Sequence, residues 1–106
     1  VESHHLIKYD DPGHGWLAVP LDVLKLHQFR VASAGEHWPY GGDAPTISTF
    51  SYVKNDYAFL EEDADMSTFL QVMELKGIDV SIDVKYQDPT PIRNYRSIRT
   101  SDLKGK

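Results

Sequence analysis

The sequence predicts a small single α+β domain in which an antiparallel sheet of about five strands carries two helices packed on one face. Three observations lead to this prediction. The chain has 106 residues, a length that suits one domain. Short apolar stretches with strand-like alternation are separated by turns rich in Gly, Pro, Asn and Asp, and two further stretches have helical spacing. The resulting order, β-β-α-loop-β-β-α-β, is typical of an antiparallel sheet covered on one side by helices.

The N-terminal part of the chain is predicted to form a β-hairpin followed by a short helix. Residues 5–9 (HLIKY) mix apolar and polar side chains at strand-like alternation, and residues 16–19 (WLAV) are an apolar run. An Asp-Pro-Gly turn lies between the two segments. A helix can begin at Pro20 because a proline in the first turn loses no intrahelical hydrogen bond. The apolar spacing that follows predicts a helix over residues 20–28.

A long loop is predicted over residues 29–45, since this segment contains three glycines and two prolines. Loops of this length are uncommon in compact domains and often have a function. Trp38 and Tyr40 lie in the loop, and large rigid rings bury much area at little entropic cost. We therefore expect these two aromatic residues to contact a partner, with a role as a lid on the core as the alternative.

The second half of the chain is predicted to form a hairpin, a helix and a strand. Residues 46–61 contain two β-prone runs around the turn Lys54-Asn55-Asp56. Residues 66–77 have an apolar helical stripe that ends at Gly77, a residue suited to the left-handed conformation just past a helix. Residues 78–86 alternate between apolar and polar side chains, which predicts a strand with one buried face.

Charge divides the chain into an acidic body and a basic end. Residues 1–92 contain six Lys and Arg against fifteen Asp and Glu, a net charge of −9, whereas residues 93–106 have a net charge of +4. We therefore expect a domain over 1–92 and a C-terminal tail, solvated or folded against the body, that contains Arg93, Arg96 and Arg99. The acidic body makes nucleic-acid binding unfavourable.

The absence of cysteine and of long apolar runs narrows the class of protein further. Without cysteine the chain has no disulfide scaffold, thiol nucleophile or iron–sulfur cluster, and this composition is compatible with a reducing cytoplasm. No apolar run approaches the roughly 18 residues of a membrane span. We expect a cytoplasmic protein that does not enter a membrane and needs no cofactor.

The most concentrated group of titratable side chains is the acidic run Glu61, Glu62, Asp63 and Asp65. Its position before a predicted helix suits capping and the positive end of the helix dipole, with Asp63 or Asp65 accepting the first-turn amides. It also suits a partner-binding acidic patch. Its spacing does not match a calcium loop, and strand neighbours point to opposite faces, so no metal site is expected here.

The histidines suggest a second class of chemistry. His14 lies near Asp10 and Asp11 in a turn where a transition metal could be held, which would suit a small metal-assisted hydrolase. The alternative is that His14 forms a hydrogen bond with the hairpin backbone. The five histidines match no zinc signature, and no serine lies in a G-x-S-x-G turn. A glycine loop of either familiar phosphate-binding type is also lacking. No catalytic residue is assigned on these grounds.

Three segments carry a resemblance to known proteins: HGWLAVP at 14–20, SYVKNDYAFLEEDADMSTF at 51–69 and PIRNY at 91–95. They resemble a group of small uncharacterised bacterial proteins, often borne by plasmids and phages, that have a similar HGW-x-VP opening and a YLEED-like junction between hairpin and helix. The resemblance implies an accessory protein of bacterial or mobile-element origin. It implies no catalytic residue.

The sequence thus favours a non-enzymatic accessory or regulatory protein that binds a protein partner through its acidic patch and aromatic loop. One form of this hypothesis is an inhibitor of a basic, nucleic-acid-binding partner, in which carboxylates take the place of phosphates. The alternatives are the metal-assisted hydrolase and a structural homo-oligomer. In the oligomer, strand 78–86 or hairpin 46–61 pairs across a two-fold axis to form a homodimer.

Overall fold

The computed structural model describes residues 3–32, 45–88 and 90–103, and in this part the chain forms a small α+β domain around a six-stranded sheet. The strands of this sheet are β1 Ser3–Asp11, β2 His14–Pro20, β5 Tyr52–Lys54, β6 Tyr57–Glu61, β7 Asp79–Tyr86 and β8 Arg96–Ser97. The helices are α1 Leu21–Leu26 and α2 Asp65–Leu75, with the 3₁₀ helices η1 Pro91–Asn94 and η2 Thr100–Leu103. Two short strands, β3 Arg30–Val31 and β4 Thr46–Ile47, pair in parallel as a second small sheet.

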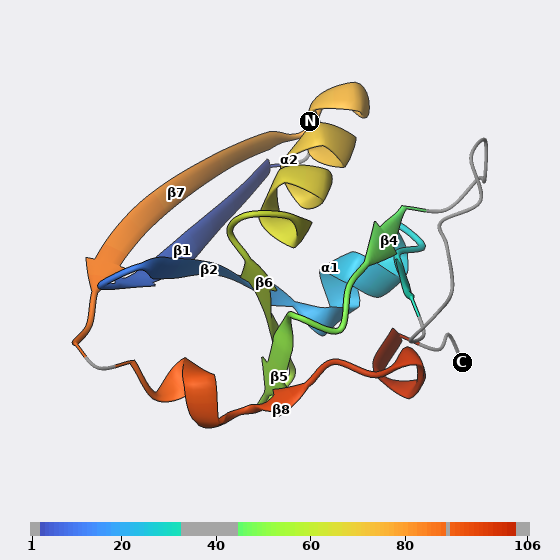
Figure 1. Cartoon of the computed structure of the whole chain (residues 1–106). Helices are drawn as coiled ribbons and strands as arrows, with labels where there is room; N and C mark the ends of the chain where they lie inside the picture. The colour runs from blue at the N-terminus through green and yellow to red at the C-terminus, as the bar shows by residue number, and fades with distance from the viewer. Residues whose placement is uncertain (1–2, 33–44, 89, 104–106) are drawn as a thin grey trace.

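The main sheet is mixed, so the prediction of an antiparallel sheet is wrong. Its order is β7-β1-β2-β6-β5-β8, and every neighbouring pair is antiparallel except β1 and β7, which are parallel. The cause is α2, which leaves β6 and carries the chain past β2 and β1 to the opposite edge of the sheet (Figure 1). A helical connection of this length lets the next strand run in the same direction as β6, whereas a tight turn reverses the chain.

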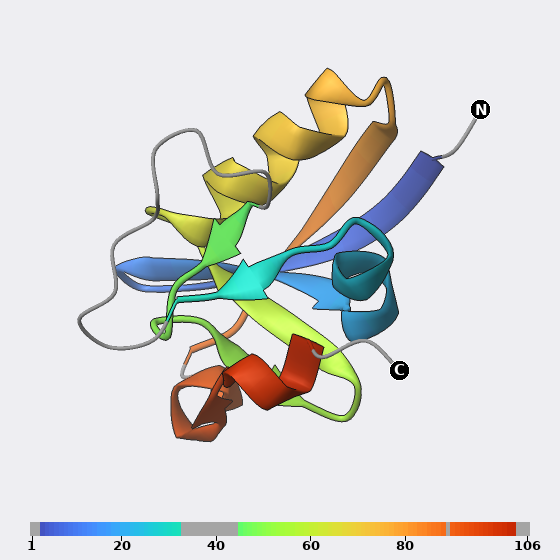
Figure 2. The same ribbon diagram turned by 90° about the vertical axis from the view of Figure 1, so that its right-hand side faces the viewer.

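One face of the sheet, here called the inner face, holds the hydrophobic core. Leu17, Val19 and Leu60 are fully buried there and pack with Leu24 of α1 and Phe69 of α2. Figures 1 and 2 show both helices and the β3–β4 pair on this side of the sheet. The alternation of a strand places the next residues of β2 and β6 on the opposite, outer face. No helix in the described part of the chain is long and apolar enough to cross a membrane.

Only the second half of the predicted hairpin 46–61 forms a hairpin, between β5 and β6. Thr46 and Ile47 pair with β3 inside the predicted loop 29–45, and β5 begins only at Tyr52. Between these strands the chain turns, and Ser48 and Ser51 both donate hydrogen bonds to the carboxylate of Asp65. A long-range contact that periodicity does not reveal therefore breaks the strand.

The first hairpin, both helices and strand 78–86 are present with shifted ends. The helix predicted over 20–28 is shorter, at Leu21–Leu26, and the one predicted over 66–77 covers Asp65–Leu75. Gly77 has the expected left-handed conformation, with φ +70°. The amides of Gly77 and Ile78 donate to the carbonyls of Glu74 and Met73, which is the Schellman pattern of helix termination.

The basic segment 93–106 takes part in the fold over its described residues. β8 pairs with β5, and Ile98 and Leu103 are buried in the core cluster. The amide of Ile98 donates to the carbonyl of Ser51 at 2.9 Å. The described residues 93–103 are therefore packed against the rest of the domain.

Candidate functional site

The four carboxylates of the acidic run do not form one patch. Glu61 and Glu62 follow one another at the end of β6 and point to opposite faces of the sheet, as strand geometry requires. Glu62 lies on the inner-face side, where Lys8 forms ion pairs with both Glu62 and Asp10. Burial acts to lower the pKa of Lys8, but the hydrogen bonds to Glu62 and Asp10 and the negative charges of these two carboxylates together outweigh it, so that the pKa is raised. Glu62 is thus already paired within the chain.

Asp65 is structural, and the prediction that Asp63 or Asp65 caps the helix is wrong. The residue is 3% exposed, and no side-chain hydrogen bond caps α2, whose N-cap residue is Ala64. Its carboxylate accepts hydrogen bonds from the amide and hydroxyl of Ser48 and from the hydroxyl of Ser51. The hydroxyl of Ser51 in turn accepts from the amide of Glu61, at 3.0 Å. Asp65 therefore holds the 48–51 turn against the start of α2.

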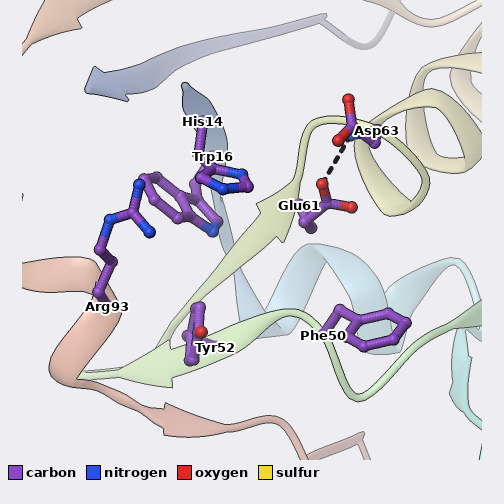
Figure 3. Close-up of a pocket in the computed structure, with 7 residues that line it drawn as sticks. All are labelled: His14, Trp16, Phe50, Tyr52, Glu61, Asp63 and Arg93. Atoms are coloured by element: carbon purple, nitrogen blue, oxygen red, sulfur yellow. Dashed lines mark hydrogen bonds between the residues drawn. The ribbon is translucent and has the colours of Figure 1, made fainter. Parts of the chain in front are cut away.

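Glu61 and Asp63 face a pocket on the outer face of the sheet, here called the aromatic–acidic pocket. It has a volume of about 350 Å³, and its lining residues are His14, Trp16, Phe50, Tyr52, Glu61, Asp63 and Arg93 (Figure 3). Glu61 is directly opposite Trp16 in the β2–β6 register. One oxygen of Glu61 accepts the amide of Asp63 at 3.0 Å, which fixes the position of the first carboxylate beside the second.

Aromatic rings form the floor and one side of this pocket. Trp16 is 3% exposed, with Tyr52 at 6.4 Å and His14 at 5.9 Å between ring centroids. Phe50, in the turn that Asp65 holds, is 72% exposed. The indole N–H of Trp16 is buried without an acceptor among the described residues. A buried donor of this kind is unfavourable unless a ligand or solvent oxygen meets it.

Arg93 closes the other side of the pocket. Its guanidinium donates to Asp11 at 2.7 Å and 2.9 Å and lies 5.4 Å from the centroid of the Trp16 ring (Figure 3). The hydrogen bond and charge of Arg93 hold the pKa of Asp11 below its ordinary value, and the carboxylate raises the pKa of Arg93. Because Arg93 is neutralised by Asp11, the carboxylates of Glu61 and Asp63 give the pocket a net negative charge.

Three of the pocket residues form a group that could hold a metal ion. One ligand atom from each of His14, Glu61 and Asp63 lies within 4.8 Å of the others. One imidazole and two carboxylates form a donor set that suits a transition-metal ion such as Zn²⁺. Asp10 and Asp11, the predicted partners of His14 in a hydrolase, instead pair with Lys8 and Arg93.

The structure brings together four of the residues that the sequence singled out, His14, Glu61, Asp63 and Arg93. Arg96 is engaged elsewhere, since it donates two hydrogen bonds to Asp102, which raises the pKa of Arg96 and lowers that of Asp102. Arg99 is exposed outside the pocket, and its amide also donates to Asp102. Trp38 and Tyr40 lie outside the described residues.

Sequence reasoning missed Trp16 and Tyr52 as site residues. Both were assigned to strands, but only the cross-strand register shows that they share a face with Glu61. Segments 14–20, 51–69 and 91–95 supply six of the seven pocket residues. Comparisons with models of protein families, with curated proteins and with solved structures find no match for this chain.

Proposed function

We propose that the protein is a non-enzymatic binding protein that takes a basic side chain of a protein partner into the aromatic–acidic pocket. The observation that carries this proposal is that Glu61 and Asp63 share one open pocket with the rings of Trp16, Phe50 and Tyr52. Carboxylates and aromatic faces both attract Lys and Arg, through charge pairing and through cation–π interaction. No group in the pocket is assigned a bond-making step.

The chemistry of the pocket also suits a peptide backbone beside the basic side chain. Tyr52 offers a ring on which the chain of the partner can pack. Outside the pocket, the net charge of −9 over residues 1–92 favours approach of a basic surface. A nucleic-acid-binding protein whose phosphate contacts are blocked by these carboxylates is the partner class that this arrangement fits.

The proposal is narrower than an acidic patch made by the whole run 61–65. Glu62 pairs with Lys8 on the opposite face, and Asp65 is buried under the 48–51 turn. Only Glu61 and Asp63 of the run line the pocket. This division predicts which carboxylates affect binding and supplies matched controls from the same few residues.

The test is a calorimetric titration of the protein with an unstructured Lys- and Arg-rich peptide at low and at moderate salt. A Gln-substituted peptide is the control ligand. Glu61→Gln and Asp63→Asn should each weaken binding by about tenfold, since each removes a charge-assisted contact. Glu62→Gln, next in sequence but on the other face, should leave the affinity unchanged. Equal affinities for wild type and a Glu61→Gln/Asp63→Asn double variant would contradict the proposal.

A second candidate function rests on the convergence of His14 with the same two carboxylates. In this case a bound divalent ion, rather than a basic side chain, is the ligand of Glu61 and Asp63, and it would supply Lewis-acid chemistry. His14→Ala separates the two candidates. It should abolish Zn²⁺ binding in a calorimetric titration if the metal is the ligand, and should leave peptide affinity within about twofold if the basic side chain is.

A further inference from the structure

The outer edge of β7 is an open strand edge at the end of the main sheet. β7 pairs with β1 over eight residue positions, and no other described strand pairs with it. Figure 1 shows it as the outermost strand, on the side of the sheet away from β8. We propose that this edge is a homodimer interface, in which two copies pair their β7 strands antiparallel about a two-fold axis at Ile82. The proposal is independent of the aromatic–acidic pocket.

The parallel pairing with β1 determines which backbone groups of β7 face outward. The amide of Gln87 donates to the carbonyl of Asp10 at 2.7 Å, and Asp10 is the register partner of Tyr86. In a parallel ladder alternate residues direct both backbone groups to the same neighbour. Odd-numbered residues of β7 therefore face β1, and the N–H and C=O groups of even-numbered residues face outward. An antiparallel second copy must pair even residues with even residues.

Charge selects one register among those that remain. With the axis at Ile82, Asp79 lies opposite Lys85 of the partner subunit, and the symmetry repeats this pair. Moving the axis to Ser81 places Asp79 opposite Asp83 of the partner subunit. Moving it to Asp83 places that carboxylate opposite its own copy. Directly opposed like charges destabilise antiparallel pairs, whereas opposite charges stabilise them.

A longer shift gives a shorter interface. With the axis at Val84, Asp83 lies opposite Lys85 of the partner subunit, but the paired segment shrinks to residues 82–86. The Ile82 register pairs residues 78–86 and contains no like-charge opposition. Charged side chains on an edge strand discourage indiscriminate pairing. On β7 the same charges disfavour the neighbouring registers, whereas Asp79 and Lys85 form opposite-charge pairs in this one.

The exposed apolar side chains of β7 also find partners in this register. Val84 is 60% exposed and Tyr86 is 65% exposed, both on the inner-face side, beyond the residues 78–80 that line a groove with α2. The register places Val84 opposite Val80, and Tyr86 opposite Ile78, of the partner subunit. Val80 and Ile78 line a groove of about 300 Å³ beside α2, together with Leu70 and Glu74 among others. Each tyrosine therefore meets the groove of the other copy.

Charge reversal tests the interface and its register together. In sedimentation and light-scattering measurements we expect wild-type protein to dimerise, whereas Asp79→Lys and Lys85→Asp should each raise the dimer dissociation constant by about tenfold or more. An equimolar mixture of the two variants should recover dimerisation, because each copy then places opposite charges across the interface. Circular dichroism of each variant confirms that the fold is retained.

Cysteine crosslinking tests the position of the axis. The chain has no cysteine, so an introduced thiol is unique. Two Ile82→Cys side chains would face each other at a Cα separation of about 5.5 Å, within disulfide range. Ile82→Cys should therefore crosslink on oxidation. Val84→Cys, with an exposed side chain on the same strand, should crosslink only when mixed with Val80→Cys.

Two results would overturn the proposal. One is a wild-type protein that sediments as a monomer up to submillimolar concentration. The other is crosslinking of Ser81→Cys or Asp83→Cys in preference to Ile82→Cys, since it would place the axis elsewhere on the strand. Failure of either kind leaves peptide binding by the aromatic–acidic pocket unaffected, because that pocket draws no residue from β7.

Discussion

Asp11 at the end of β1 accepts two hydrogen bonds from Arg93 in η1, at 2.7 Å from Nε and 2.9 Å from Nη2. The Asp11 side chain is 3% exposed, and its partner lies more than eighty residues away in the sequence. The same guanidinium lies over the ring of Trp16. This one ion pair therefore fastens the segment after β7 to the first hairpin and positions one side of the aromatic–acidic pocket.

The ion pair predicts a loss of stability in acid. The pKa of Asp11 lies below its ordinary value of 3.8, so the unfolded chain binds a proton more readily than the native protein does. The stabilisation is complete above about pH 4 and is lost as the pH falls through the native pKa. Asp11→Asn should lower the melting temperature at neutral pH and make its decline below about pH 4 less steep.

Thermal unfolding followed by circular dichroism between neutral and acidic pH measures this effect. Asp56→Asn, in the exposed turn between β5 and β6, is the control and should keep the steep acid decline of the wild type. Parallel pH profiles for wild type and Asp11→Asn would show that Arg93 does not stabilise the native state through this carboxylate.

Asp65 and Asp63 lie in the same acidic run, but their replacement should change the free energy of unfolding by very different amounts. Asp65→Ala removes the acceptor for Ser48 and for the fully buried hydroxyl of Ser51, which should cost about 2–3 kcal/mol of unfolding free energy. Asp63→Ala, at an exposed position, should change it by less than about 0.5 kcal/mol. Urea unfolding of the two variants gives the comparison, and similar losses would contradict a structural role specific to Asp65.

Local sequence patterns predicted most of the elements, because their causes are local. The first hairpin and the strand at 78–86 follow from alternation, and the end of α2 follows from Gly77. The direction of β7 had no local signal. It depends on α2 returning the chain to the β1 edge of the sheet, and a strand's own residues are compatible with either direction.

The candidate site was predictable only in part, for the same physical reason. The acidic run and Arg93 were noticed, but which carboxylates face the pocket depends on the register of β6 against β2. A shift of one residue in that register would exchange Glu61 for Glu62 on the outer face. Asp65 escaped prediction because its partners, Ser48 and Ser51, come from a turn that resembles a strand in sequence.

Gly77 offers a direct test of a conformation that the sequence did predict. The residue has φ +70°, and an added Cβ would meet nothing within 4 Å, so the cost of a side chain here comes from the backbone alone. Gly77→Ala should lower the unfolding free energy by about 1 kcal/mol. Gly77→Asn should recover part of that loss, since asparagine tolerates the left-handed region. Equal stability of the alanine variant and wild type in urea would exclude this helix termination.

Ile98 tests whether the basic C-terminal segment belongs to the domain. Its side chain is 1% exposed and packs in the core cluster, although it lies between the charged residues Arg96 and Arg99. Truncation of a buried side chain loses both its transfer free energy and the contacts around the cavity, so Ile98→Ala should cost about 2–4 kcal/mol. Arg99→Ala removes a charge from the same segment at an exposed position and should cost less than about 0.5 kcal/mol. If the segment were a solvated tail, both variants would unfold at the same urea concentration as wild type. If the segment completes the sheet through β8, only Ile98→Ala should unfold at a clearly lower urea concentration.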